Sequence, residues 1–500
     1  MKVGTCIPIR VNSAVTDSIV ESDVKVLLLS SSLLTDRMLQ HTKILSALNE
    51  TTDVNVWATS ARNPRFHEVW SQTPACVNEF PEVRPFREFP HNYLRRLNEF
   101  IWDYHKRPPS RLSIDQHIRA SNQRLRVRAL KLPARGLAAV GMAEPFEDRL
   151  EKILLDYPRS PKALQLFREK PPTVLVTMGP HRYEEPAVIA AAKELGIPVL
   201  AFIASWDNIS TKTRMVFKYD GYLLWSESMR RELHHFYPQS REVPSYIVGA
   251  PQFDVFFQPR YQVSREAYCA SQGLRPDLPI VLYAIGSPNF IRGEYDGAVE
   301  MAHRVARGEL GDVQLVIRPH PIHDNGELAE SLRRISPRIL LQHTSEAGTP
   351  LIARSQDEQQ ITEWVNTFRH ADVVVNLFST VSIDAAIFDR PIVNLDYDPA
   401  PGQPNQALVK DVNHVWTHFK PIAESGGVWN VNNADEMIEA IRTYLAHPEL
   451  HREKRRWIAE YVCGYVDGRC GERMADAVLD FLQHLEEKRR PRFGNLRVTA

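Results

Sequence analysis

Short apolar runs alternate with segments of helical spacing along most of the chain. The run at 24–30, VKVLLLS, is continuously apolar and ends in a small polar residue, which is typical of a parallel strand covered on both faces. The segment at 35–50 then has apolar residues at helical spacing, and DVNVWATS at 53–60 predicts the next strand. The chain therefore begins with a β-α-β series.

The alternation is interrupted at about residues 80–165 and resumes after residue 172. Helical patterns lie between the later apolar runs, and the pattern at 473–490 predicts a long helix near the end of the chain. The later strands are predicted within residues 173–179, 197–205, 221–226, 245–254, 279–287, 313–321, 372–380 and 391–398.

This pattern predicts an α/β protein with two doubly wound, Rossmann-like domains that face each other across a cleft. The length of 500 residues also favours at least two domains. We expect an N-terminal domain at 1–250, which carries a helical insertion at about 80–165, a C-terminal domain at 251–485, and a basic tail at 486–500. We also expect the C-terminal helices to cross back to the N-terminal domain.

Composition narrows the class of protein. The formal net charge is zero, so no general attraction to nucleic acid is expected. The start of the chain lacks the apolar core of a signal peptide, and no run of eighteen apolar residues is present. The cysteines are scattered without metal-ligand spacing, which favours free thiols in a reducing compartment. They are Cys6, Cys76, Cys269, Cys463 and Cys470. We therefore expect a soluble, cytoplasmic protein.

The insertion is strongly basic. Between Lys106 and Arg135 it has nine Lys or Arg residues and one acid, and three arginines at 124, 126 and 128 alternate with apolar residues. The segment fits a solvated helical insertion. It also fits a patch that faces an anionic acceptor or makes peripheral contact with the inner face of an anionic membrane.

Polar residues follow four of the predicted strands, and the carboxyl ends of parallel strands are where ligands bind in such sheets. These residues are Asp207, then Gly286, Ser287 and Asn289, then Arg318 and His320, and finally Ser379 and Thr380. Ser379 lies at or just before the start of a helix, whose N–H groups and dipole favour a phosphate. Serine capping alone would explain the same pattern.

Arg318 and His320 strengthen the case for a phosphate site. Arginine offers a charged fork for phosphate oxygens, and histidine donates from a ring nitrogen. The prolines on either side of His320 fix the loop and remove backbone donors, so side chains would do the binding. Taken alone, this loop also fits an ordinary surface turn. Together with the helix start at Ser379, it can converge on one pyrophosphate.

Asp207 lies in the other predicted domain. It follows Trp206, precedes Asn208, and has Lys212 nearby. A carboxylate across the cleft from a phosphate site is well placed for a general base. An Asp-Asn turn or a helix cap is the alternative.

At these residues the chain resembles a known family. The segments SWDN (205–208), VGAPQFD (248–254), IGSPN (285–289), RPHP (318–321) and NLFSTVSIDAAIFDRPIVNLDYD (376–398) resemble GT-B glycosyltransferase-like proteins. The branch most like it contains CDP-glycerol glycerophosphotransferases and capsule or surface-polysaccharide transferases. The resemblance covers roughly residues 173–398.

The resemblance implies a nucleotide-activated donor in the C-terminal domain and an acceptor in the N-terminal domain. His320, Ser379 and Thr380 would hold the donor phosphates, and Asp384 would hold the nucleotide end. The complete predicted donor site is Gly286, Ser287, Asn289, Arg318, Ser379, Thr380, Ser382 and Asp384, with His320 also catalytic. The predicted acceptor site is Trp206, Asn208 and Lys212, beside the catalytic Asp207.

One departure from the family pattern affects the reaction. Glycerophosphotransferases of this branch have T-W-H-G where this chain has Ser205–Asn208, so Asp207 replaces the histidine. An aspartate base suits an inverting, metal-independent transfer of a sugar from a nucleotide sugar to a glycan or lipid-linked acceptor. Transfer of a polyol phosphate from a CDP-alcohol is the main alternative. A sugar-nucleotide 2-epimerase would need D-S-G-G where this chain has FSTV (378–381). A non-catalytic nucleotide-binding protein is the last alternative.

We expect no cofactor and no metal, since the nucleotide-activated donor is a substrate. The LDYD segment, with Asp396 and Asp398, matches a short metal-nucleotide pattern of another transferase fold. That pattern is frequent by chance, and the resemblance implies that side chains and helix ends take the place of a metal.

Overall fold

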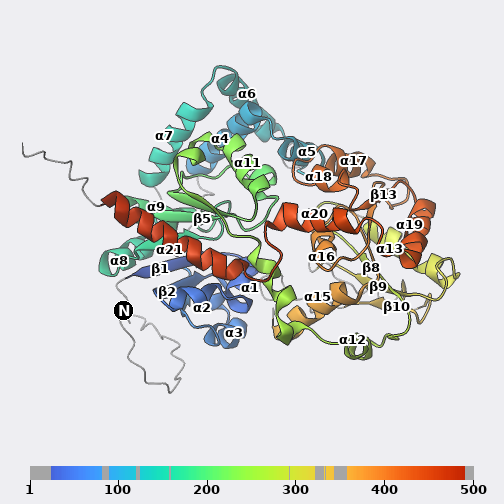
Figure 1. Cartoon of the computed structure of the whole chain (residues 1–500). Coiled ribbons are helices and arrows are strands. Elements are labelled where there is room, and N and C mark those ends of the chain that lie inside the picture. Colours follow the sequence, from blue (N-terminus) through green and yellow to red (C-terminus); the bar gives the residue numbers. More distant parts are fainter. Residues whose placement is uncertain are drawn as a thin grey trace, which may run out of the picture.

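The computed structural model contains two parallel β-sheets, one in each half of the molecule (Figure 1). Their strands are covered by helices on both faces, which agrees with their continuously apolar sequences. The structure describes residues 24–81, 89–119, 124–156, 159–291, 293–320, 331–332, 334–342 and 357–489.

The first sheet has seven parallel strands in the described part of the chain, in the order β3-β2-β1-β4-β5-β6-β7. Because Val26 of β1 pairs with both Val54 and Val174, the chain reverses its direction of winding between β1 and β4. This is the topological switch point, beside which ligands bind in such sheets. The strands are β1 (Lys25–Ser30), β2 (Asp53–Ala58), β3 (Cys76–Glu79), β4 (Val174–Thr177), β5 (Val199–Phe202), β6 (Gly221–Leu224) and β7 (Ser245–Ile247).

The helix predicted at 35–50 is two helices. Thr42 adopts an extended backbone between them, and its hydroxyl donates to the carbonyl of Met38 at 2.6 Å. The turn lets both helices bury an apolar face against the first sheet. The helices of this sheet are α1 (Leu33–His41), α2 (Ile44–Asn49), α3 (His67–Ser71), α8 (Pro161–Glu169), α9 (Pro186–Glu194), α10 (Asn208–Thr211) and α11 (Glu227–Phe236).

The insertion forms a helical subdomain with a small core of its own. Helix α4 packs against α6 and α7, and their buried side chains include Phe100, Ile101 and Leu130. In Figure 1 this subdomain stands at the top of the molecule, with α6 at its apex. Its helices are α4 (His91–Lys106), α5 (Pro109–His117), α6 (Leu125–Ala139) and α7 (Ala143–Asp156).

The second sheet has six parallel strands in the described part of the chain, in the order β10-β9-β8-β11-β12-β13. Its switch point lies between β8 and β11. The strands are β8 (Ile280–Ala284), β9 (Gln314–Arg318), β10 (Ile339–Leu341), β11 (Val373–Asn376), β12 (Ile392–Leu395) and β13 (Trp429–Val431). The helices around it are α12 (Arg265–Gln272), α13 (Glu294–Ala306), α15 (Glu358–His370), α16 (Val381–Ile387), α17 (Gln406–His414), α18 (Lys420–Ala423) and α19 (Ala434–Ala446).

The last two helices, α20 (Arg452–Cys463) and α21 (Cys470–Arg489), return from the second sheet to the first (Figure 1). Helix α20 packs on α16, whereas α21 packs on α2 and β6. Asp254 caps the start of α21, where its carboxylate accepts from the backbone N–H groups of Cys470 and Gly471. Gly464 ends α20 at a positive φ, and a Cβ there would collide with the carbonyl of Trp225.

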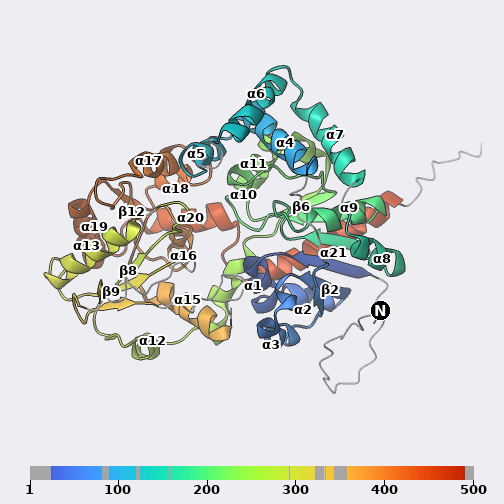
Figure 2. The same cartoon turned by 180° about the vertical axis from the view of Figure 1, so that it is seen from behind.

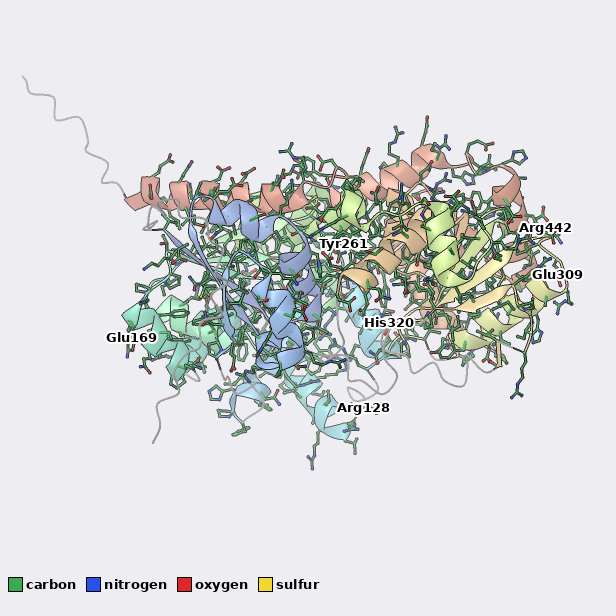
Figure 3. All side chains as sticks on the ribbon, turned by 90° about the horizontal axis from the view of Figure 1, so that it is seen from below. Arg128, Glu169, Tyr261, Glu309, His320 and Arg442 are labelled. Atoms are coloured by element: carbon green, nitrogen blue, oxygen red, sulfur yellow. The ribbon has the colours of Figure 1, made fainter. Side chains whose placement is uncertain are left out.

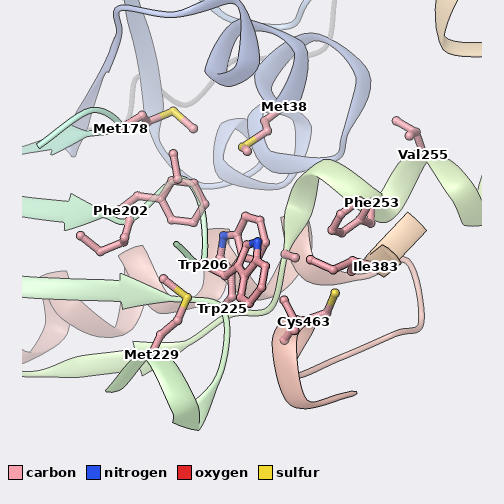
Figure 4. Close-up of a cluster of buried hydrophobic side chains, with 14 of the residues drawn as sticks. Met38, Met178, Phe202, Trp206, Trp225, Met229, Phe253, Val255, Ile383 and Cys463 are labelled. Atoms are coloured by element: carbon pink, nitrogen blue, oxygen red, sulfur yellow. The ribbon is translucent and has the colours of Figure 1, made fainter. Parts of the chain in front are cut away.

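The two halves also share a buried cluster. Figure 4 shows Trp206 and Trp225 of the first half beside Phe253, Ile383 and Cys463. The Trp225 and Phe253 rings are in edge-to-face contact with centroids 6.1 Å apart. The carboxyl ends of β5 and β6 are therefore joined to the second half through apolar packing.

Helix α5 makes a second bridge between the halves, because it packs on α17 as well as on α10 (Figures 1 and 2). Ser113 donates to Asp411 at 2.7 Å and accepts from the indole of Trp416 at 2.9 Å. His117 lies 3.1 Å from the same Asp411 carboxylate. Part of the basic insertion is therefore an interdomain contact.

The predicted fold is confirmed: two doubly wound sheets, with C-terminal helices that cross back. Helix α21 continues to Arg489, into the range expected to be a tail, and residues 490–500 lie outside the described part. None of the described helices is both long and apolar enough to cross a bilayer. The described cysteines are free thiols: Cys76, Cys269, Cys463 and Cys470.

Candidate functional site

The second sheet places most of the predicted donor residues at the carboxyl ends of β8, β9 and β11, which are neighbouring strands. Gly286 follows β8 and lies against the backbone carbonyl of Leu377, which follows β11. The loops after these two strands therefore meet. Arg318 is the last residue of the adjacent strand β9.

Arg318 is held firmly at this edge. Its Nη1 donates to Oε1 of Gln342 at 2.8 Å and lies 3.5 Å from Oε1 of Glu363. Burial lowers the pKa of Arg318, and the charge of Glu363 partly offsets that effect. The guanidinium is thus a fixed cation at the end of β9.

His320 lies two residues beyond β9 and is half-buried. Figure 3 places it at the centre of the molecule, far from the ends marked by Glu169 and Arg442. The next proline, Pro321, and His323 lie outside the described residues.

Asn376, the last residue of β11, organises the start of α16. Its side-chain oxygen accepts from the N–H of Ser379 at 2.9 Å and from the hydroxyl of Ser382 at 3.2 Å. Ser379 in turn accepts from the N–H of Val381 at 3.3 Å. Ser382 is fully buried, so it supports the turn, whereas Thr380 is exposed. Ser379 and Thr380 are therefore the hydroxyls of this turn that a ligand can reach.

Asp384 is buried in α16 and joins three elements. Its Oδ1 accepts from the indole N–H of Trp364 at 2.8 Å. Burial raises the pKa of Asp384 to about 7, while Trp364, Arg37 of the first half and Arg318 act in the opposite direction. Arg37 itself lies over the ring of Trp364, 4.3 Å from its centroid. The predicted donor residues Arg318 and Asp384 are thus brought together, with Arg37 as a partner that the sequence did not reveal.

The loop after β8 is arranged around Glu294, the first residue of α13. Its carboxylate accepts from the N–H of Gly286 at 2.9 Å. Burial raises the pKa of Glu294 to about 8. The hydroxyl of Ser287 accepts from the N–H of Asn289 at 3.3 Å. The side chain of Asn289 is exposed at the tip of this loop.

Asp207 follows β5 at the carboxyl edge of the first sheet. Its carboxylate oxygens accept from the hydroxyl of Ser205 at 2.5 Å and from that of Thr211 at 3.0 Å. Burial would raise the pKa of Asp207, but Lys212, His418 and the two hydroxyls outweigh it and lower the pKa below its ordinary value. Asp207 is therefore a stable anion at this position. The other predicted acceptor residues differ in exposure, because Asn208 is half-buried in α10 and Lys212 is exposed.

His418 faces Asp207 from the second half, in the segment before α18. Its ring makes an edge-to-face contact with Trp206, with centroids 4.8 Å apart. Burial lowers the pKa of His418 to about 4, although Asp207 acts in the opposite direction. Among the described residues of the second half, His418 is thus one that interacts electrostatically with Asp207, and the sequence did not reveal it.

His181 is a third functional candidate that sequence reasoning missed. It follows β4, the strand next to β5, and its Nδ1 lies 2.9 Å from the carbonyl of Thr213. Burial lowers the pKa of His181 to about 4, and both Lys212 and Asp207 interact with it electrostatically. Its signal in the sequence is Pro180–His181 directly after the apolar run predicted as a strand at 173–179, which is similar to Pro319–His320 after β9.

The two aspartates of LDYD serve the local structure. Asp396 lies 2.8 Å from Lys410 and 2.9 Å from His414. Asp398 accepts from the backbone and side-chain amides of Asn405. Within the described residues, no group of three or more His, Cys, Asp or Glu side chains is arranged to hold a metal.

Comparison with solved structures defines the class of fold. MnaA of S. aureus in its UDP co-structure has a TM-score of 0.52 at 11% identity, over 92% of this chain and 97% of that one. The UDP-GlcNAc 2-epimerase of Neisseria meningitidis bound to UDP-GlcNAc has a TM-score of 0.52 at 12% identity, over 91% and 100% of the two chains. At these identities the likeness concerns the fold, which is GT-B-like. A comparison with curated proteins gives no match.

A family model is more specific. The model described as CDP-Glycerol:Poly(glycerophosphate) glycerophosphotransferase matches residues 191–480, more than half of the chain. The chain therefore belongs to this family of nucleotide-donor transferases, as the resemblance predicted.

Proposed function

We propose that the protein transfers a polyol phosphate from a nucleotide-linked donor to a hydroxyl group of a polymeric acceptor. The observation that carries this proposal is the family match over 191–480, because that range contains Asp207 on one side and Arg318 and Ser379 on the other. The family description names CDP-glycerol as donor and poly(glycerophosphate) as acceptor. A CDP-linked polyol is therefore the first donor to test.

On the donor side, the fixed cation Arg318 and the donor groups of His320, Ser379 and Thr380 are suited to hold the two phosphates. In the proposal, the loop Gly286–Asn289 closes one side of the donor, and Ser382 supports the turn. The predicted contact of Asp384 with the nucleotide stays a prediction. Its hydrogen bond to Trp364 supports a positioning role for α16 as well.

On the acceptor side, the reaction needs a hydroxyl oxygen beside the phosphorus atom. In the proposed step this oxygen forms a bond to phosphorus while the bond from phosphorus to the nucleoside monophosphate breaks. The leaving nucleotide keeps the electron pair, and the hydroxyl proton goes to a base at the carboxyl end of the first sheet. Trp206, Asn208 and Lys212 are proposed to hold the acceptor, and no metal is assigned a role.

A second candidate function is inverting transfer of a sugar. One observation favours it: the carboxylate of Asp207 stands where the branch has a histidine, and its lowered pKa keeps it anionic. In that reaction the acceptor oxygen bonds to the anomeric carbon and a nucleotide diphosphate leaves. The residues assigned to the donor phosphates are the same in both reactions.

Donor screening distinguishes the two candidates. Thermal-shift measurements against CDP-polyols and against UDP-, GDP- and CMP-linked sugars show which nucleotide is bound. A transfer assay with each bound donor then identifies the group that moves. Release of CMP with gain of a polyol phosphate by the acceptor supports the first candidate, and release of a nucleoside diphosphate with gain of a sugar supports the second.

We also propose that helix α6 makes peripheral contact with an anionic membrane surface on which the acceptor is held. Leu125, Leu132 and Val140 are 81%, 70% and 72% exposed, and apolar side chains that are exposed together on one element are typical of protein or membrane interaction sites. Arg128 points away from the body of the protein in Figure 3, and Arg124 and Arg126 beside it are also exposed.

Apolar side chains beside arginines suit the boundary between headgroups and acyl chains. Two basic residues of the predicted patch are engaged elsewhere, because Arg111 pairs with Asp103 and Lys131 pairs with Asp115. The proposed membrane face is therefore α6 with the turn that follows it.

A further inference from the structure

The surroundings of Asp207 contain three buried polar nitrogen atoms without a hydrogen-bond partner among the described residues. They are Nε2 of His181, Nε1 of Trp206 and Nδ1 of His418. Buried polar groups in folded proteins are nearly always paired. Three such atoms around one carboxylate point to a ligand that supplies the missing partners.

The indole N–H of Trp206 can only donate a hydrogen bond, whereas a ring nitrogen of a neutral histidine can also accept a proton. In His181 the tautomer is fixed by the partner of the second ring nitrogen. The carbonyl of Thr213 can only accept a hydrogen bond, so Nδ1 of His181, at 2.9 Å, carries the hydrogen. In the neutral ring, Nε2 then carries a free lone pair. That lone pair is buried at the carboxyl edge of the first sheet, where it has no acidic hydrogen to accept within the described residues.

We propose that Nε2 of His181 accepts the proton of the acceptor hydroxyl during transfer. This inference rests on the proposed function, because it needs a hydroxyl acceptor, and it holds for both candidate donors. It also accounts for the departure at 205–208: the imidazole that the branch carries after β5 is supplied here from the end of the neighbouring strand β4.

The acceptor O–H bond breaks as its oxygen bonds to the donor phosphorus or anomeric carbon, and the proton moves to Nε2 of His181. The donor bond to the leaving nucleotide breaks, and the nucleotide keeps its electron pair. The resulting imidazolium is stabilised by the Asp207 anion and later releases its proton to water.

Asp207 itself is less suited to take the proton. Both of its oxygens already accept hydrogen bonds, one from the hydroxyl of Ser205 and the other from that of Thr211. His418 is the competing base, since its Nδ1 is also unpartnered among the described residues. Comparison of His181 with His418 therefore has to be part of the test.

The charges around His181 set its response to pH. Lys212 and Arg95 lower its pKa, whereas Asp207 and the hydrogen bond to Thr213 raise it. Burial is the largest effect and lowers the pKa to about 4, so the imidazole is neutral at pH 7, and the charge of Asp207 opposes burial when the ring takes up a proton. The base is therefore lost only in acid, when His181 is protonated.

The test compares His181→Asn with wild type on the donor that wild type uses. Asparagine keeps an N–H donor for the Thr213 carbonyl but has no basic nitrogen, so the fold and donor binding are expected to persist. We expect kcat to fall about 100- to 10,000-fold, as is usual for loss of a general base, with little change in the Kd for the donor. His181→Gly should regain part of its activity when imidazole is added.

His447, an exposed residue next to Glu449, gives the control, and His447→Asn should keep full activity. Retention of kcat within about threefold by His181→Asn would overturn the inference. A severe loss of kcat in His418→Asn, with His181→Asn still active, would overturn it as well. A wild type that uses no donor of the panel contradicts the proposed function and this inference with it. An active wild type with an equally active His181→Asn contradicts only the inference.

Discussion

Trp206 and His418 stand edge to face with ring centroids 4.8 Å apart, although they belong to opposite halves of the molecule. The contact brings the segment before α18 against the carboxyl end of β5. Trp206 precedes Asp207 directly, so the position of the carboxylate depends on how the two halves meet. Packing between the halves is therefore part of the site.

Two substitutions at Trp206 should separate packing from hydrogen bonding. Trp206→Ala removes a buried ring and should lower the free energy of unfolding by about 3–5 kcal/mol. Trp206→Phe keeps most of the ring and removes an N–H that has no partner within the described residues, so it should cost less than about 1.5 kcal/mol. Urea denaturation measures the free energy of unfolding of both variants, and Trp457→Ala, at an exposed tryptophan of α20, is the control. Equal losses for the two variants would contradict this account.

The bridge made by α5 predicts a second stability effect. Ser113→Ala leaves the buried indole N–H of Trp416 without its acceptor and removes a donor to Asp411. We expect a loss of about 1–3 kcal/mol in the free energy of unfolding. Ser46→Ala, at an exposed serine of α2, should change it by less than about 0.5 kcal/mol. If both variants behave alike in urea, the bridge does not stabilise the fold.

Glu185 predicts a pH dependence of stability. It is fully buried, accepts from Ser31 at 2.5 Å and from Thr177, and burial raises its pKa to about 7. Because the pKa of Glu185 is higher in the folded than in the unfolded state, its protonated carboxyl group stabilises the fold fully below about pH 4.5. This contribution to stability is lost as the pH rises through about 7.

The loss of unfolding free energy should amount to at most about 3.5 kcal/mol for this group. Glu185→Gln cannot ionise, so its stability should fall less than that of wild type between pH 5 and pH 8. Urea unfolding at the two pH values measures the difference. An unchanged pH dependence in the variant would show that Glu185 does not titrate as described.

Vesicle binding tests the membrane face. Combined charge reversal of Arg124, Arg126 and Arg128 should weaken binding to anionic vesicles at least about 100-fold, since each arginine contributes roughly 1 kcal/mol near such a surface. Leu125→Ser with Leu132→Ser should weaken binding even at low salt, because it removes the inserted apolar groups.

A matched triple reversal serves as control for this experiment. It uses Arg442, Lys454 and Arg456 of α19 and α20, which changes the net charge equally but leaves α6 intact. Flotation of wild type and variants with anionic and neutral vesicles provides the measurement. Equal binding by the α6 variant and wild type would remove α6 from the proposal.

The core strands could be predicted from sequence because burial on both faces gives continuous apolar runs, as in β1 and β8. The strands β3, β10 and β13 were not predicted. They are three or four residues long, lie at sheet edges and are only partly buried, so their sequences carry no such run. The break at Thr42 was also missed, since helical spacing continues across it.

Several residues of the site could be predicted from the ends of the predicted strands, because side chains that follow parallel strands lie at one edge of the sheet. Arg318 and Asp384 do meet. His418 could not be found this way, since its role depends on contact between halves that no local pattern encodes. His181 could have been found, because Pro180–His181 follows a predicted strand much as Pro319–His320 does.

The most direct test of the account is transfer itself. Wild type and His320→Ala are incubated with CDP-linked polyols or nucleotide sugars and a hydroxyl-bearing polymer, and mass spectrometry follows the nucleotide and the acceptor. The account predicts that wild type releases CMP and adds a polyol phosphate to the acceptor. It also predicts that His320→Ala, which removes a hydrogen-bond donor to the donor phosphates, loses this activity about 100-fold or more. Failure of wild type to transfer any group, or conversion of a UDP-sugar into its epimer, would contradict it.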